Sequence, residues 1–185
     1  MLFVPRKQLF LLLALFFVLG SITYANDKKS LRILYIVRNY PAISETYVHE
    51  EIASLWNEYN IKIISIGSKA KVTRKNFFPY EQHSVKELDQ AIQEFQPHIM
   101  HTHWLTHAPL LEKLANKHHV HFTIRSHSFD ILAHKRQLNS YCKAANSQWC
   151  LGVICFPAFR NRLINNGLSE AKITDCWSVV NFQRF

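Results

Sequence analysis

The fold is decided by residues 96–132, which read QPHIMHTHWLTHAPLLEKLANKHHVHFTIRSHSFDIL. Within this stretch, two short apolar runs at residues 99–100 and 120–124 each end on polar and histidine side chains. Between the runs, leucine and alanine side chains recur over residues 106–118 at spacings that line one face of a helix. The pattern therefore predicts a strand, a helix and a second strand.

Polar side chains follow both of these predicted strands. His101 and His103 come just past the first strand, and Arg125 and His127 come just past the second. In open parallel sheets, ligands bind outside the carboxyl ends of the strands. We therefore expect the four side chains to face one crevice and to form the functional site.

The same alternation continues on both sides of this stretch. Further strands are predicted at residues 31–37, 61–66, 151–156 and 173–180, and helices at residues 45–57, 84–95, 135–145 and 157–166. Ser84 and Glu87 have the spacing of a capping box, and Gly167 follows the last helix at a C-cap position. Strands and helices that alternate in this way predict an α/β fold, a Rossmann-like parallel sheet with helices on both faces.

Composition and charge fit one globular domain and narrow its partners. The chain has 185 residues, of which 48% are hydrophobic and 19% are charged, so it can bury a sizeable core. A formal net charge of +9 favours anionic partners such as phosphates, nucleotides or lipid headgroups. The basic residues are scattered and no predicted helix carries a basic stripe with interleaved aromatics, so no nucleic-acid partner is predicted.

The N-terminus has the pattern of a targeting segment. Arg6 and Lys7 precede an apolar run at residues 9–19, which is short for a membrane span, and small residues follow at Thr23 and Ala25. This order predicts a cleavable secretory signal over residues 1–25 and a folded domain over residues 26–185. The alternative is an uncleaved membrane anchor, so the predicted location is exported or membrane-associated.

Histidine and cysteine patterns raise the question of a metal site. His101, His103 and His107 could supply the three protein ligands of a catalytic zinc ion. Against this, His107 falls in the following helix, no carboxylate lies nearby in the sequence, and a metal-binding barrel would need about 200 residues or more. The 4 cysteines form no Cys-x-x-Cys pair and are expected to be buried thiols. We predict no metal and no cofactor, and rank a metallohydrolase last.

The site candidate best supported by residue chemistry is the segment 123–130. Arg125 offers a planar guanidinium group for a phosphate or carboxylate, and His127 can donate or accept a hydrogen bond near neutral pH. Asp130 could orient that histidine or cap the next helix. The alternative is a polar loop whose only role is to cap a helix.

A second candidate is the start of the helix predicted at residues 45–57. Ser44 can cap this helix, and Glu45 and Thr46 follow it in the first turn. Free amides at a helix N-terminus, together with the helix dipole, bind phosphate or carboxylate oxygens. The glycines that allow close approach to a diphosphate are missing, and ordinary helix capping is the alternative.

Five stretches resemble motifs of one family and occur in the family's order. The family is the glycosyltransferases of the colanic-acid and exopolysaccharide biosynthesis type, which are family 4-type retaining enzymes. The matched stretches are residues 41–48 (their P-x-x-S-E-T-F), 97–104 (P-D, two hydrophobic residues, H-x-H), 123–131 (T-x-H-G-x-D-I), 165–173 (N-G-hydrophobic … K-I) and 180–185 (V-D-x-x-R-F). Ser128 stands in place of the glycine of the third motif.

The resemblance covers residues 31–185 and implies the N-terminal, acceptor-side domain of a glycosyltransferase B fold, which has two Rossmann-like domains. It implies transfer of sugar from a sugar-nucleotide donor, held mainly by the second domain through a Glu-x7-Glu pair, to a glycan or lipid-linked acceptor without a metal. It makes His127, which faces the donor sugar, the catalytic residue. The predicted substrate contacts are Ser44, Glu45, Thr46, His103, Arg125 and Asp130.

Three functions remain open, of which the metallohydrolase is ranked last. The first is a glycosyltransferase domain that needs a separate donor-binding domain and is inactive alone, because the chain ends where the second domain should begin. The second is a non-catalytic, exported or membrane-tethered domain that binds a glycan or phosphate. Sugar nucleotides are made in the cytosol, so an exported bacterial enzyme would lack its donor. A eukaryotic lumenal enzyme, or an anchored domain on the cytosolic side, would not.

Overall fold

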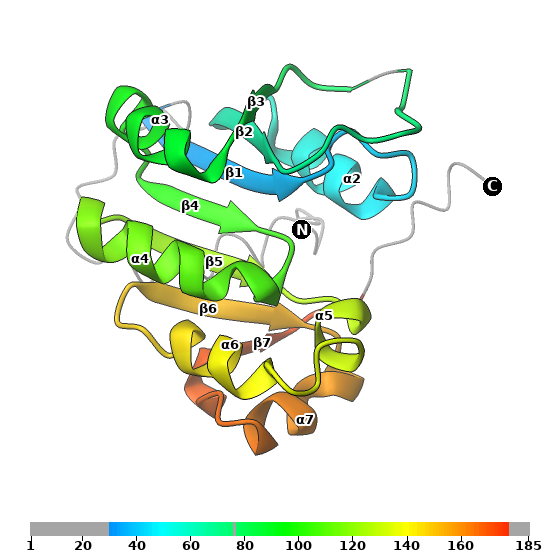
Figure 1. Ribbon diagram of the computed structural model, residues 1–185, viewed down its shortest axis with the longest axis vertical. Coiled ribbons are helices and arrows are strands. Elements are labelled where there is room, and N and C mark those ends of the chain that lie inside the picture. The colour runs from blue at the N-terminus through cyan, green and yellow to red at the C-terminus, as the bar shows by residue number, and fades with distance from the viewer. Residues whose placement is uncertain (1–29, 76, 178–185) are drawn as a thin grey trace, which may run out of the picture.

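The computed structural model describes residues 30–75 and 77–177 (Figure 1). Two sequence predictions lie outside these residues. One is the signal or anchor over residues 1–25, and the other is the motif at residues 180–185.

Within the described residues, seven strands form one sheet in the order β3-β2-β1-β4-β5-β6-β7. All pairings between neighbouring strands are parallel. The strands are β1 Arg32–Arg38, β2 Asn60–Ile66, β3 Glu81–His83, β4 Ile99–Thr102, β5 His121–Arg125, β6 Cys150–Cys155 and β7 Ile173–Asp175. The helices are α2 Thr46–Leu55, α3 Leu88–Phe95, α4 Ala108–His118, α5 Ser128–Leu132, α6 Leu138–Ala145 and α7 Arg160–Asn165.

Helices cover the sheet on two sides, and the alternation of side chains along β1 explains why. Leu34 and Ile36 belong to a core that includes α3, α4 and α6, which run along one face of the sheet in Figure 1. Tyr35 and Val37 point to the opposite face and pack in a second core with α2. A strand buried on both faces needs a continuous apolar run, which is what its sequence shows. The predicted parallel α/β fold is confirmed.

The strand order places a topological switch point between β1 and β4. From β1 the chain proceeds outward to β2 and β3, and it then returns to β4 on the other side of β1. In the register, Tyr35 of β1 pairs with His101 of β4, and His101 pairs with Thr123 of β5. The carboxyl ends of these central strands therefore lie side by side, at the edge where open α/β sheets bind ligands.

Two of the three predicted helix caps are confirmed. The Ser84 backbone N–H donates to Glu87 Oε2 at 2.6 Å, and the reciprocal bond completes the capping box ahead of α3. Gly167 follows α7 with φ of 87°, a left-handed conformation that favours glycine. Ser44 does not cap α2: Glu45 holds the N-cap position, without a side-chain capping bond. The exposed Ser44 lies instead in the turn before it.

Element boundaries differ from the prediction where polar residues enter an element. The short edge strand β3 was not predicted because its residues, Glu-Gln-His, lack an apolar run. An edge strand has only one neighbour, and charged side chains are common there. α5 was predicted only as a polar loop, and α6 begins at Leu138 rather than at residue 135. β7 ends at Asp175, before the predicted end at residue 180.

The structure also shows the state of the cysteines and the character of the helices. All four cysteines are free thiols, and Cys142, Cys150 and Cys155 are buried, which confirms the prediction for these three; Cys176 is partly exposed. Among the helices of residues 30–75 and 77–177, we find none with the length and apolar character needed to cross a membrane.

Candidate functional site

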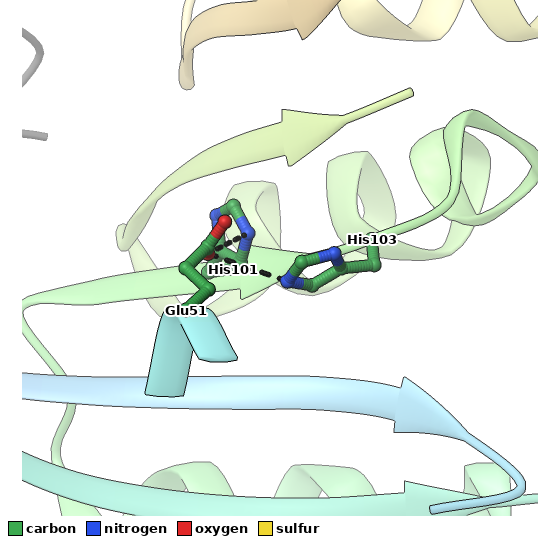
Figure 2. A group of neighbouring side chains, drawn as sticks. All are labelled: Glu51, His101 and His103. Atoms are coloured by element: carbon green, nitrogen blue, oxygen red, sulfur yellow. Dashed lines mark ion pairs between the residues drawn. The ribbon is translucent and has the colours of Figure 1, made fainter. Parts of the chain in front are cut away.

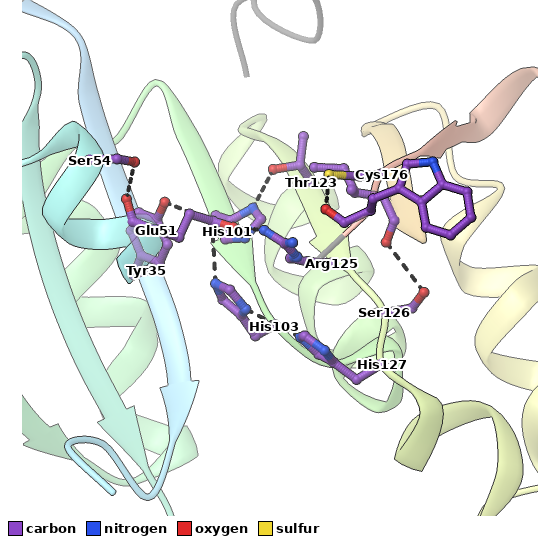
Figure 3. A network of polar contacts seen from close by, with 12 residues as sticks. Tyr35, Glu51, Ser54, His101, His103, Thr123, Arg125, Ser126, His127 and Cys176 are labelled. Carbon is purple, nitrogen blue, oxygen red and sulfur yellow. Dashed lines mark hydrogen bonds and ion pairs between the residues drawn. The ribbon is translucent and has the colours of Figure 1, made fainter. Parts of the chain in front are cut away.

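The predicted site residues at the carboxyl ends of β4 and β5 do converge (Figure 3). His101 is the last but one residue of β4 and lies on the same face as Ile99, which packs with α2, and His103 directly follows the strand. Arg125 ends β5, and His127 begins the turn into α5. The structure thus brings together the four side chains that the sequence placed at one edge.

A carboxylate that the sequence analysis missed lies at the centre of this group. Glu51 extends from α2 toward the sheet, and only 9% of its side chain is exposed (Figure 2). Its Oε1 lies 3.1 Å from His101 Nε2 and 3.3 Å from His103 Nε2. The Tyr35 hydroxyl donates to the same oxygen at 3.0 Å.

Arg125 balances the charge of this carboxylate. Its Nη1 donates to Glu51 Oε2 at 2.7 Å, the length of a strong charge-assisted hydrogen bond. Burial by itself would raise the pKa of Glu51, but His103 and His101 outweigh burial and hold that pKa well below its usual range. Burial by itself would lower the pKa of the Arg125 guanidinium. The nearby Glu51 carboxylate outweighs burial, so the pKa of Arg125 is raised. Both members of the pair are therefore ionised at neutral pH.

The position of Glu51 follows from the period of α2. Val48, Ile52 and Leu55 are the buried residues of this helix and mark the face that packs against the sheet. Glu51 is three residues after Val48 and four before Leu55, so it must lie on the same face. An acidic residue on the apolar face of a helix needs a buried partner. This signal was present in the sequence and could have identified Glu51.

The second ring nitrogen of each strand-end histidine has its own partner. His101 Nδ1 lies 2.7 Å from Thr123 Oγ1, and His103 Nδ1 lies 3.4 Å from His127 Nε2. The side chain of His103 is fully buried. Burial lowers the pKa of His103 more than Glu51 raises it. His103 therefore contacts other side chains rather than open solvent.

His127 lies at the outer end of this network. Its ring packs 4.2 Å from the ring of Tyr47 and parallel to that of His103, at 5.6 Å between centroids. The pKa of His127 is lowered to about 3, mainly by burial and then by the neighbouring His103 and Arg125. The imidazole is therefore neutral near pH 7 and offers one donor and one acceptor.

The Asp130 side chain accepts hydrogen bonds from the backbone of two segments. Its Oδ2 accepts the N–H of Leu105 at 3.0 Å and the N–H of His127 at 3.1 Å. The carboxylate is fully buried, and burial raises its pKa to about 6 against those two hydrogen bonds. Asp130 thus caps α5 and ties the turn after β4 to the turn after β5, which holds His103 and His127 side by side.

The structure separates two other predicted groups from this network. Ser44 and Thr46 are exposed at the start of α2, and Glu45 is partly buried there with a pKa that burial raises to about 7. From this segment it is Tyr47 that reaches His127. His107 Nδ1 lies 2.8 Å from Thr102 Oγ1, and His107 does not join the histidines around Glu51.

A small pocket opens beside His127. It has a volume of about 190 Å³ and is lined by Arg125, Ser126, His127, Ser128, Ile154, Cys155, Phe156, Phe159 and Cys176. Ligand pockets that enclose a drug-sized molecule are larger, roughly 300 Å³ or more. The pocket can therefore hold one small polar ring or an anionic group, and its lining includes an arginine, a histidine and two phenylalanine rings.

One group of side chains in the described part of the chain has the donors for a metal ion. Ligand atoms of Glu51, His101 and His103 all lie within 4.8 Å of one another. In the sequence no carboxylate lies near the histidines, which was one reason to predict no metal. The carboxylate comes from α2, about 50 residues earlier in the chain.

Comparison with known proteins identifies relatives by structure only. No family model matches the sequence, and no curated protein matches it. Among solved structures, the apo form of the lipopolysaccharide outer core galactosyltransferase WaaB matches with a TM-score of 0.59 at 17% identity, over 78% of this chain and 44% of that chain. HepE from Anabaena in complex with UDP matches with a TM-score of 0.68 at 13% identity, over 83% of this chain and 45% of that chain.

A second HepE structure, in complex with UDP-glucose, matches with a TM-score of 0.64 at 12% identity, over 83% of this chain and 45% of that chain. This chain therefore spans slightly less than half the length of these proteins. Its fold is that of one of the two Rossmann-like domains of glycosyltransferases with the B fold.

Proposed function

We propose that this chain is the acceptor-side domain of a retaining glycosyltransferase. It would work with a donor-binding domain to transfer sugar from a sugar nucleotide to a glycan or lipid-linked acceptor. The observation that carries the proposal is the neutral His127 on the wall of a small polar pocket, at the carboxyl ends of the central strands. The fold match to slightly less than half the length of the two glycosyltransferase structures supports it.

His127 is the proposed catalytic residue because it is the histidine that lines the pocket. A neutral imidazole can donate a hydrogen bond to a sugar hydroxyl or accept one from it. Arg125 lines the same pocket, and it uses Nη1 to hold Glu51. A guanidinium group has five N–H donors, so others stay available for a phosphate or hydroxyl oxygen.

We assign His103 and Asp130 positioning roles rather than the substrate contacts predicted for them. His103 is buried against the ring of His127, and Asp130 accepts the backbone N–H of His127. Together with Tyr47 they fix the orientation of the His127 ring before a substrate arrives. Such pre-organisation lowers the cost of reaching a reactive arrangement.

The proposal is tested by nuclear magnetic resonance titration of the isotope-labelled chain with methyl glucoside and methyl galactoside. We expect shift changes at the pocket, and His127→Ala should weaken glycoside binding about 2- to 10-fold, since a typical hydrogen bond is worth roughly 0.5–1.5 kcal/mol. His121→Ala is the matched control, because His121 begins β5, at the end of the strand remote from the pocket. Binding that is equal in His127→Ala and the wild type would refute the assigned role of His127.

A further inference from the structure

We propose that Glu51, His101 and His103 form a binding site for one divalent transition-metal ion of the Zn²⁺ class. The inference concerns a different chemistry from sugar transfer and does not depend on the proposed function. It departs from our sequence prediction that no metal is bound. Two imidazoles and a carboxylate are a common protein ligand set for zinc.

The spacing of the three donor atoms fits such an ion. Zinc bonds of about 2.0–2.2 Å in a tetrahedral site place neighbouring ligand atoms about 3.3–3.5 Å apart. Glu51 Oε1 lies 3.1 Å from His101 Nε2 and 3.3 Å from His103 Nε2. The third pair of ligand atoms, on His101 and His103, lies within 4.8 Å, so shifts of the side chains would bring all three atoms to one ion.

The two histidine nitrogens that face Glu51 have no hydrogen-bond partner apart from their close approach to its carboxylate. His101 Nε2 and His103 Nε2 are buried and make no aligned hydrogen bond, although each lies close to the carboxylate. Buried polar atoms normally have a hydrogen-bond partner, so an exception needs an explanation. A bound cation would satisfy both nitrogens, and Glu51 Oε1, which also accepts from the Tyr35 hydroxyl, would be its third ligand atom.

The outer contacts of the two rings are those that metal-bound histidines use. A metal-binding histidine donates its other N–H to a nearby acceptor, which fixes its tautomer and orientation. His101 Nδ1 lies 2.7 Å from Thr123 Oγ1, and His103 Nδ1 lies 3.4 Å from His127 Nε2. When each Nδ1 donates outward, the lone pair of each Nε2 points toward Glu51.

Arg125 limits the affinity of the site without closing it. The guanidinium group binds Glu51 Oε2, the oxygen that does not face the histidines. Its positive charge repels a second cation nearby. We therefore expect weaker binding than at a three-ligand site without a neighbouring arginine. We also expect tighter binding when Arg125 is replaced by Gln.

The test is titration of the metal-free full chain with Co²⁺, followed by the visible absorption of the four-coordinate ion, and displacement by Zn²⁺. We expect one ion per chain. His103→Gln should abolish the absorption band, and Thr123→Val should weaken Co²⁺ binding by about 10- to 100-fold, the usual effect of losing an outer-shell partner. Because Val matches Thr in shape, Thr123→Val keeps the test decisive if His103→Gln does not fold.

His121→Gln is the matched control, since the chain has 11 histidines and any of them could bind Co²⁺ at the surface. The control should bind Co²⁺ as the wild type does. The proposal is overturned if the wild type forms no one-to-one complex or if the band survives in His103→Gln. It is also overturned if Thr123→Val binds as tightly as the wild type.

Discussion

Glu51 illustrates how one residue can organise a site without belonging to a recognisable motif. Its carboxylate contacts Tyr35, His101, His103 and Arg125, which come from three strands and the turn after one of them. Sequence reasoning placed the strand-end residues correctly because strand ends follow from apolar runs. It missed Glu51 because the partners of this carboxylate lie far away in the chain. Local periodicity shows only that position 51 faces the core.

Replacing Glu51 by Ala should destabilise the fold strongly. The change leaves Arg125 buried beside His101 and His103 without a counter-charge, and breaking a buried ion pair costs about 3–5 kcal/mol. Urea denaturation of the wild type and the variant measures the difference in the free energy of unfolding. Glu94→Ala, at an exposed position on α3, should change it by less than about 0.5 kcal/mol. A loss below 1 kcal/mol for Glu51→Ala would contradict the account.

Asp130 should give the fold a specific pH dependence. Its folded-state pKa of about 6 lies above the ordinary value, so between pH 4 and 6 the folded chain binds this proton more tightly than the unfolded chain. The stabilisation is therefore present at low pH and is lost as the pH rises through 6. Between pH 5 and 7, the wild type should lose about 1 kcal/mol of stability relative to Asp130→Asn. A constant difference between the two proteins would refute the raised pKa.

At the scale of elements, the sequence predicted the elements that bury an apolar face. The strands β1, β2, β4, β5 and β6 and the helices α3 and α4 fall within a few residues of the prediction. The short elements β3 and α5 were missed, because their residues are polar and their conformation depends on neighbours. β3 forms by pairing with the free edge of β2. α5 is held in place by the hydrogen bond from the Leu105 N–H to Asp130.

The capping box ahead of α3 gives a prediction at this scale. Ser84→Ala removes the side-chain oxygen that accepts the N–H of Glu87, so it should lower stability by about 1 kcal/mol. Thermal unfolding followed by circular dichroism measures the change. Ser84→Thr keeps an oxygen at the same position and should stay close to the wild type. Equal losses in both variants would show that the cap is not the cause.

For the whole molecule, the fold class could be predicted from the alternation of strands and helices, and structural comparison confirms it. The site edge could be predicted as well, because parallel strands place their carboxyl ends together. The Glu51 contacts and the buried positions of His103 and Asp130 could not, since burial depends on the packed structure. The signal or anchor over residues 1–25 stays a prediction.

This chain matches slightly less than half the length of two glycosyltransferase structures, which leads to a prediction about activity. The purified chain alone should transfer no sugar from UDP-glucose or UDP-galactose to water or to methyl glycosides, because positioning donor and acceptor together supplies much of the catalysis. Release of UDP, measured with a coupled assay, reports turnover. Sustained turnover by homogeneous protein would show that one domain suffices and would contradict the proposed division of labour.

The central claim is that the pocket beside His127 receives the acceptor side of the reaction. The most direct measurement compares the binding of methyl glycosides and of UDP to the same isotope-labelled chain by nuclear magnetic resonance. The account predicts that glycosides shift the resonances of Arg125, Ser126 and His127, and that UDP binds more weakly at these residues. Tight UDP binding in this pocket, with no response to any glycoside, would contradict the claim and make this the donor side.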